Sequence, residues 1–323
     1  MTAPALAEER AERHRSRWRL GLRLATPIVL IGLLWNLADG PGALALLGDL
    51  DWTYIVLAFV AVNLQTLASA WRWHRVAARL GQVISLRQAV AEYYLSQVVN
   101  QSLPGGVLGD AARAVRARHK VGLGIAAKAV IIERLAGQIA MFSLLALGLA
   151  WAMLMPGGLV LTIEPWQIAV AVAAVGLVAL AIGLARRAAG KRWPRGFGTA
   201  LHAALVADGA WMEQALLGVV IVTLNLASFT LCALATGTAL GVEAVLVLVP
   251  LILCAMLVPA SVAGWGFREG AAAALFPLAG ATATAGFAAS VAFGLVILAA
   301  SLPGLLVLTS KSHSSSIHPE QRR

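Results

Sequence analysis

Two segments of the chain place charged side chains next to helix-breaking residues within otherwise apolar sequence. The first contains Asp110 and Arg113, and the second contains Arg268 and Glu269. The start of a helix offers unpaired backbone N–H groups and the positive end of its dipole, so anions bind there readily. An arginine at such a start would add a bidentate partner for phosphate. Both segments therefore predict anion-binding chemistry, with Arg113 and Arg268 as the phosphate ligands.

The helix starts that this chemistry needs are expected after each break, at Gly109–Asp110 and at Gly266–Phe267. An alternative role exists for the acidic residue of the first break. Asp110 could simply cap the helix that runs through Arg116, because aspartate is a preferred N-cap residue. A cap there would not exclude a neighbouring anion site.

Further charges lie deep in apolar sequence at Glu133 and Arg134. Such residues usually face a cavity or pair with one another, because a charge in lipid is costly. They could contact a substrate. They could equally form structural ion pairs across the two halves of the chain, Glu133 with Arg268 or Glu269 with Arg134. The polar run from Asn100 to Ser102 could line the same cavity or satisfy the backbone of a broken helix.

Other chemistry finds no support in the sequence. The six histidines are expected in polar loops or tails without metal-ligand spacing, and the two cysteines lie in apolar runs. Gly105-Gly106 with Gly109 is not followed by the G-K-[ST] of a nucleotide-binding loop. Ser96 and Ser102 lack a nearby activating histidine. We expect no metal, no cofactor and no enzymatic activity.

The composition identifies the surrounding solvent as lipid. Of 323 residues, 60% are hydrophobic and only 12% are charged, and the mean hydropathy is +0.82. A soluble domain carries about twice that charge fraction, so a soluble globular enzyme is excluded. The net charge of +10 comes from basic blocks that flank apolar segments. The positive-inside rule and anionic lipids at the cytoplasmic face explain these blocks better than nucleic acid does.

The spacing of the basic blocks predicts the topology. Only 25 residues separate Arg87 from Arg113, whereas two crossings need about 40. A re-entrant hairpin centred on residues 100–106 returns the chain to the same side. A second broken segment spans 242–281, as a hairpin or as two short spans, which would give eight spans in all. The full spans are expected at 20–37, 52–70, 129–155, 166–185, 215–236 and 284–308.

This arrangement predicts an all-α integral membrane protein of about six full spans and two broken hairpins. Residues 1–19 and 310–323 form a basic cytoplasmic N-terminus and a cytoplasmic tail around one membrane domain, 20–309. The acidic segment 39–51 is expected as an outward loop. The breaks share proline, two small residues, valine, an apolar residue and glycine, at 104–109 and at 259–264. This shared pattern predicts two half-repeats, 20–155 and 166–309, that cross the membrane in opposite orientations, as in inverted-repeat transporters.

In combination, these motifs resemble the lysylphosphatidylglycerol synthase transmembrane-domain family. The resemblance spans about residues 20–308 and rests on the runs 100–113, 132–135 and 259–269. In two-part members the membrane region is the flippase half and a soluble aminoacyltransferase domain follows it. Only a short tail follows here, so lysyl transfer is not carried over. The resemblance implies that the central site is lined by Asn100, Pro104, Gly105, Gly106, Gly109, Asp110, Glu133, Arg134, Pro259, Ser261, Gly264, Gly266 and Glu269.

The leading hypothesis is a bacterial inner-membrane flippase that holds an anionic lipid head group in a midplane cavity. The lipid would be a phospholipid or a polyprenyl-linked lipid. A membrane enzyme of the lipid-phosphate phosphatase type is the second hypothesis. It needs an acid/base carboxylate, such as Glu92 or Glu133, and an activated nucleophile that is not evident. A non-transporting scaffold is the third, and intramembrane charges argue against it.

Overall fold

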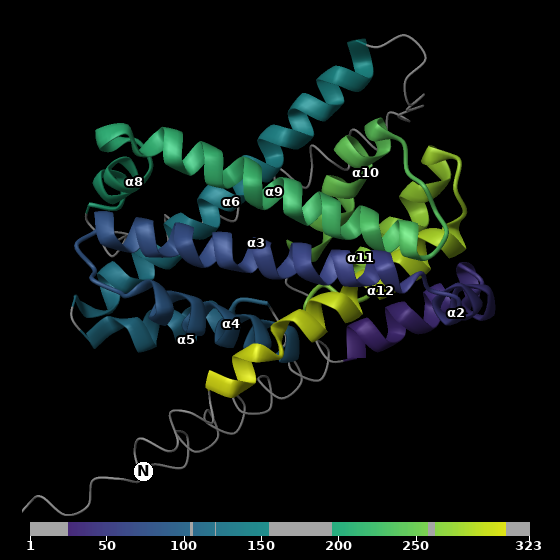
Figure 1. Cartoon of the computed structure of the whole chain (residues 1–323), viewed down its shortest axis with the longest axis horizontal. Coiled ribbons are helices and arrows are strands. Elements are labelled where there is room, and N and C mark those ends of the chain that lie inside the picture. Colours follow the sequence, from purple (N-terminus) through teal and green to yellow (C-terminus); the bar gives the residue numbers. More distant parts are fainter. Residues whose placement is uncertain (1–24, 104–105, 120, 155–195, 258–261, 308–323) are drawn as a thin grey trace, which may run out of the picture.

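The computed structural model describes residues 25–103, 106–119, 121–154, 196–257 and 262–307. Helices make up its elements, and the long helices Trp52–Arg79 and Ala210–Ala235 run side by side (Figure 1). Within this described part, four helical stretches are long and apolar enough to cross a bilayer. They are Trp52–Arg79, Gly122–Ala152, Ala207–Ala235 and Ala283–Val307. The protein is therefore an all-α membrane protein, as the composition predicts.

The first predicted span differs from expectation at its end. The helix Ala25–Leu37 bends by 93° into α2 (Gly40–Gly48), so the segment expected as an outward loop is mostly helical. Two of its three aspartates cap helices through their side chains. Asp39 accepts a hydrogen bond from the backbone N–H of Gly42 at 3.2 Å, and Asp51 accepts one from Thr53 at 2.8 Å. Aspartate favours both loops and N-caps, and here the apolar residues between the caps continue as helix.

Helix α3 (Trp52–Arg79) lies near the middle of the bundle and packs along α9 (Ala210–Ala235) (Figure 1). An ion pair joins the basic end of α3 to the start of α9, with 2.6 Å between Arg75 Nε and Glu213 Oε1. Arg79 adds a hydrogen bond from Nη1 to the carbonyl of Ala207. The short α8 (Phe197–Leu205) and the 3₁₀ turn η3 (Ala207–Gly209) precede α9 at this end.

The first predicted hairpin is present as α4 (Leu86–Ser102) and α5 (Leu108–Arg116). Contacts between the two helices run in opposite sequence order: Asn100 meets Gly109, Ser96 meets Asp110, and Glu92 meets Arg116. Helix α5 therefore folds back along α4. The 3₁₀ turn η1 (Ala117–His119) then leads into α6 (Gly122–Leu154), which begins earlier than the predicted 129.

The second broken segment consists of α10 (Val242–Cys254), η4 (Ala255–Leu257), α11 (Phe267–Leu275) and η5 (Phe276–Ala279). At 1.5 Å per residue, α10 and α11 are about 20 and 14 Å long, short of the roughly 30 Å hydrocarbon layer. The two helices contact each other. These lengths favour a hairpin over two separate spans.

The apolar core beside this hairpin involves α9, α11 and α12 (Ala283–Ser301). Phe229 packs edge-on against Phe293, with ring centroids 5.3 Å apart, and against the ring of Phe276 at 6.3 Å. The predicted fourth span, 166–185, lies outside the described residues. The two half-repeats therefore remain a prediction.

Candidate functional site

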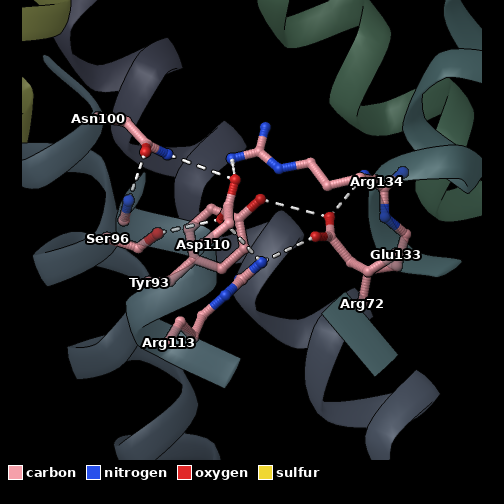
Figure 2. A network of polar contacts seen from close by, with 9 residues as sticks. Arg72, Tyr93, Ser96, Asn100, Asp110, Arg113, Glu133 and Arg134 are labelled. Atoms are coloured by element: carbon pink, nitrogen blue, oxygen red, sulfur yellow. Dashed lines mark hydrogen bonds and ion pairs between the residues drawn. The ribbon is translucent and has the colours of Figure 1, made fainter. Parts of the chain in front are cut away.

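A polar network lies where α3, α4, α5 and α6 meet (Figure 2). Its members are charged or hydrogen-bonding side chains that contact one another across these four helices. Helix α3 contributes Arg72, α4 contributes Tyr93, Ser96 and Asn100, α5 contributes Asp110 and Arg113, and α6 contributes Glu133 and Arg134. We call these eight side chains the arginine network.

Glu133 is one acidic centre of the arginine network. Its carboxylate is fully buried. Oε1 accepts hydrogen bonds from Arg72 Nη2 at 3.0 Å and from the Tyr93 hydroxyl at 3.3 Å, and Oε2 accepts one from Arg113 Nη2 at 3.2 Å. Each oxygen of this carboxylate is thus engaged by a guanidinium group.

Asp110 is the second acidic centre. Its carboxylate lies 3.1 Å from Arg113 Nη2 and 2.6 Å from Arg134 Nη2. It also accepts hydrogen bonds from the Ser96 hydroxyl at 3.1 Å and from the Asn100 amide at 3.4 Å. The N-cap role considered for Asp110 is wrong, because α5 begins before it, at Leu108, and Asp110 lies in the first turn.

Arg113 connects the two acidic centres, and Figure 2 shows its guanidinium reaching both carboxylates. The guanidinium carbon lies 4.5 Å from the ring centroids of both Trp73 and Tyr93. A guanidinium over aromatic faces is stabilised by the ring quadrupoles, most strongly away from water. Arg113 is fully buried, so its role is to hold α5 against α3, α4 and α6.

The arginine network is electrically unbalanced. Three guanidinium groups face two carboxylates, and each carboxylate is already engaged by two arginines. Arg72 and Arg113 each keep a buried Nε and Nη1 with no hydrogen-bond partner in the described part of the chain. Buried donors without partners and a buried unpaired charge are both costly. The site therefore carries one positive charge and donors that favour an anion.

A cavity of about 140 Å³ adjoins the arginine network. Arg72, Glu133 and Arg134 line it, so the unbalanced charge faces open space. Neutral polar side chains line other parts of the wall: Gln65, Ser69, Gln138 and Asn225. The Arg134 side chain is 46% exposed, whereas that of Arg72 is 4% exposed. Arg134 is therefore the more accessible cation, with Arg72 behind it.

The second break forms a separate network with α12. Arg268 Nη2 lies 2.5 Å from Glu269 Oε1, and Arg268 Nε and Glu269 Oε1 both contact the hydroxyl of Ser290, at 3.0 and 3.2 Å. Glu269 Oε2 also accepts the backbone N–H of Gly266 at 2.6 Å. The start of α11, expected to be free for an anion, is thus capped by its own carboxylate.

The cross-pairing considered between the two breaks is wrong. Glu133 pairs with Arg72 and Arg113, while Glu269 pairs with the adjacent Arg268. Among the described residues, no hydrogen bond or ion pair links the two networks. The neutral Arg268–Glu269 pair is complete by itself, so it does not need a partner from the first half.

The predicted site residues fall into three groups. The structure brings together Asn100, Gly109, Asp110, Arg113, Glu133 and Arg134. It places Gly264, Gly266, Arg268 and Glu269 at the second break, and Gly106 in the turn of the first hairpin at φ 62°. The last group lies outside the described residues: Pro104, Gly105, Pro259 and Ser261.

Sequence reasoning missed Arg72, Tyr93 and Ser96 as members of the network. Arg72 belongs to a basic cluster at the end of a span, which is typical of a topology signal. One signal could have identified it: it is the first arginine of that cluster, so it lies deepest in the apolar segment.

Among the described residues, no group of histidine, cysteine, aspartate or glutamate could hold a metal ion.

Comparison with known proteins gives one match. Residues 20–304 match the family model described as lysylphosphatidylglycerol synthase TM region. The curated proteins contain no match to the chain. No solved structure matches it either.

Proposed function

Because the chain belongs to the lysylphosphatidylglycerol synthase transmembrane-region family, we propose that it translocates an anionic lipid across the membrane. The family is membrane-embedded and linked to lipid handling. In this proposal the lipid head group occupies the cavity beside the arginine network, and the acyl chains stay in the bilayer. Transport, rather than chemistry on the lipid, is the activity.

One observation carries the proposal: an unbalanced positive charge borders a cavity inside a membrane domain. Arg134 and Arg72 line that cavity, and Arg72 has buried donors without partners. Intramembrane charges are costly and mark substrate pathways when they face a cavity. A phosphate bound in the cavity could accept hydrogen bonds from the exposed Arg134 and balance the charge, which a membrane scaffold has no need to do.

The same proposal includes the location of the protein. Basic residues such as Arg75 and Arg79 lie at one end of α3, while Asp49 and Asp51 lie at the other. The positive-inside rule then orients the basic end toward the cytoplasm. We propose a bacterial inner-membrane protein with both termini in the cytoplasm, where its basic blocks contact anionic lipids.

The test is lipid scrambling by the full chain in liposomes. Fluorescent anionic lipid in the inner leaflet becomes accessible to an impermeant quencher only after crossing the bilayer. We expect the wild-type protein to expose it faster than empty liposomes do, and Arg134→Ala to lose most of that activity. Arg118→Ala is the matched control, because Arg118 is exposed in η1, outside the arginine network.

Rates equal to those of empty liposomes for every anionic lipid would end the translocase proposal. The enzyme alternative is checked in the same samples by phosphate release from a lipid diphosphate. Release that depends on Glu133 would replace transport with hydrolysis. If the protein neither scrambles lipid nor releases phosphate, the scaffold hypothesis is the one that remains.

A further inference from the structure

The positive charge of the arginine network needs a counter-ion whether or not a lipid is bound. We infer that the cavity binds a small monovalent inorganic anion such as chloride, held by Arg134 together with the side-chain amides of Gln138 and Asn225. The binding of this anion is independent of transport. Its displacement by an incoming lipid head group rests on the proposed translocase function.

The charge is accessible from the cavity. Three arginines and two carboxylates leave one positive charge in the network. The side chains of Arg72 and Arg113 are buried, so ions in solution cannot approach them. Arg134 is partly exposed and lines the cavity. Because an uncompensated charge away from water is costly, a counter-ion stabilises the network most when it lies in the cavity beside Arg134.

Two amides of the wall offer N–H groups to the same ion. Gln138 lies one helical turn after Arg134 on α6, and Asn225 lines the cavity from α9. Within the described part of the chain, neither side-chain amide has a hydrogen-bond partner. Residues one turn apart share a helix face, so the Gln138 amide and the Arg134 guanidinium can bind one anion together.

Charge and space favour a small monovalent anion. One negative charge neutralises the network, whereas a doubly charged anion would leave excess negative charge next to the carboxylate of Glu133, which also lines the cavity. Like charges at close range repel. The cavity volume of about 140 Å³ is about ten times what one water molecule needs, so a halide ion fits together with water.

Thermal unfolding of the full chain in detergent tests the site. Sodium chloride and sodium bromide are compared with sodium gluconate at equal ionic strength, because gluconate has the same charge and is much larger. We expect each halide to raise the unfolding temperature by at least about 2 °C over gluconate, since a ligand that binds only the folded state stabilises it. No halide shift in the wild-type protein would overturn the anion site.

A fixed negative charge in the wall gives the sharper test. Gln138→Glu places a carboxylate beside Arg134, so this variant should unfold at a higher temperature than wild type in gluconate and show no halide shift. The uncharged Gln138→Met should keep a shift, because Arg134 remains. Equal halide shifts in wild type and Gln138→Glu would reveal a general salt effect and overturn the site. A larger difference between these two proteins in phosphate than in chloride would overturn the choice of a monovalent anion.

Lipid scrambling provides the functional comparison. If a head group must displace the anion, scrambling of an anionic lipid in proteoliposomes should be at least about two-fold slower in chloride than in gluconate once chloride exceeds its dissociation constant. Equal rates in the two salts, despite a halide shift, would overturn the displacement. Scrambling without a halide shift would refute the anion site alone. A halide shift without scrambling of any lipid would refute the translocase and leave the anion site.

Discussion

The side chain of Asn100, at the end of α4, caps the helix that follows the break. Its Oδ1 accepts the backbone N–H of Gly109 at 2.8 Å, and its amide donates to Asp110 at 3.4 Å. One amide thus uses both of its functions across the hairpin. The cap of α5 comes from the preceding helix and not from the sequence next to its first turn.

Replacing this amide should loosen the hairpin. Asn100→Ala leaves an N–H at the start of α5 without its acceptor, so we expect a loss of about 1 kcal/mol in unfolding free energy. Thermal unfolding of the purified protein in detergent measures it. Gln101→Ala is the control at the adjacent residue, and an equal loss in both variants would show that the cap contributes nothing specific.

The close approach of α5 to α4 requires glycine at 109. A Cβ added there would lie 2.1 Å from the backbone carbonyl oxygen of Ser96, so Gly109→Ala must push the two helices apart. We expect a cost of about 1–3 kcal/mol from overpacking and slower lipid scrambling.

Gly124→Ala is the matched substitution in α6, where an added Cβ meets nothing within 4 Å. Alanine is the better helix former, so this variant should unfold at the same temperature as wild type or slightly higher. A Gly109→Ala protein as stable as Gly124→Ala would contradict the close packing of the hairpin.

Two carboxylates in ion pairs should differ strongly in their contribution to stability. Glu133 is fully buried between two arginines, and Glu133→Gln leaves buried cations without their counter-charge. We expect a loss of about 3–5 kcal/mol. The Arg75–Glu213 pair is part-exposed, at 42% and 26% of the two side chains, and Glu213→Gln should cost no more than about 1 kcal/mol.

Chemical unfolding of both variants tests this contrast. Because Glu133→Gln could yield little folded protein, the double variant Arg72→Met with Glu133→Gln serves as a second measurement, and it should recover part of the loss. Equal costs for the two single variants, or no recovery in the double variant, would show that burial does not set the strength of these pairs.

The second network should serve stability alone. Ser290 is fully buried and contacts both Arg268 and Glu269, so Ser290→Ala removes one partner from each. We expect a loss of about 1–3 kcal/mol, with lipid scrambling unchanged, because this serine does not line the cavity. Scrambling by Ser290→Ala that is as slow as that by Arg134→Ala would place Ser290 in the head-group site.

The number of residues between two basic blocks was enough to predict the first hairpin. Too few residues separate Arg87 from Arg113 for two crossings, and Asn100 and Gly109 flank the turn that the structure contains. Local signals were less informative about α2. Asp39 and Asp51 indicate a loop and a helix cap equally well, and only the apolar residues between them decide the outcome.

Pairing between distant residues could not be predicted from local signals. Arg72 and Glu133 are 61 residues apart, and nothing near either residue specifies the other. The sequence predicted that these charges face a cavity or one another, and in both networks they form ion pairs. It could not show that Glu269 finds its partner in the adjacent Arg268, because that depends on how α11 begins.

The order of charges on α6 has a mechanical consequence. Glu133 contacts α3 through Arg72, and its neighbour Arg134 contacts α5 through Asp110. Consecutive residues of a helix point about 100° apart, so any rotation of α6 strains both attachments together. The two ion pairs therefore couple the rotation of α6 about its axis to the position of the α4–α5 hairpin.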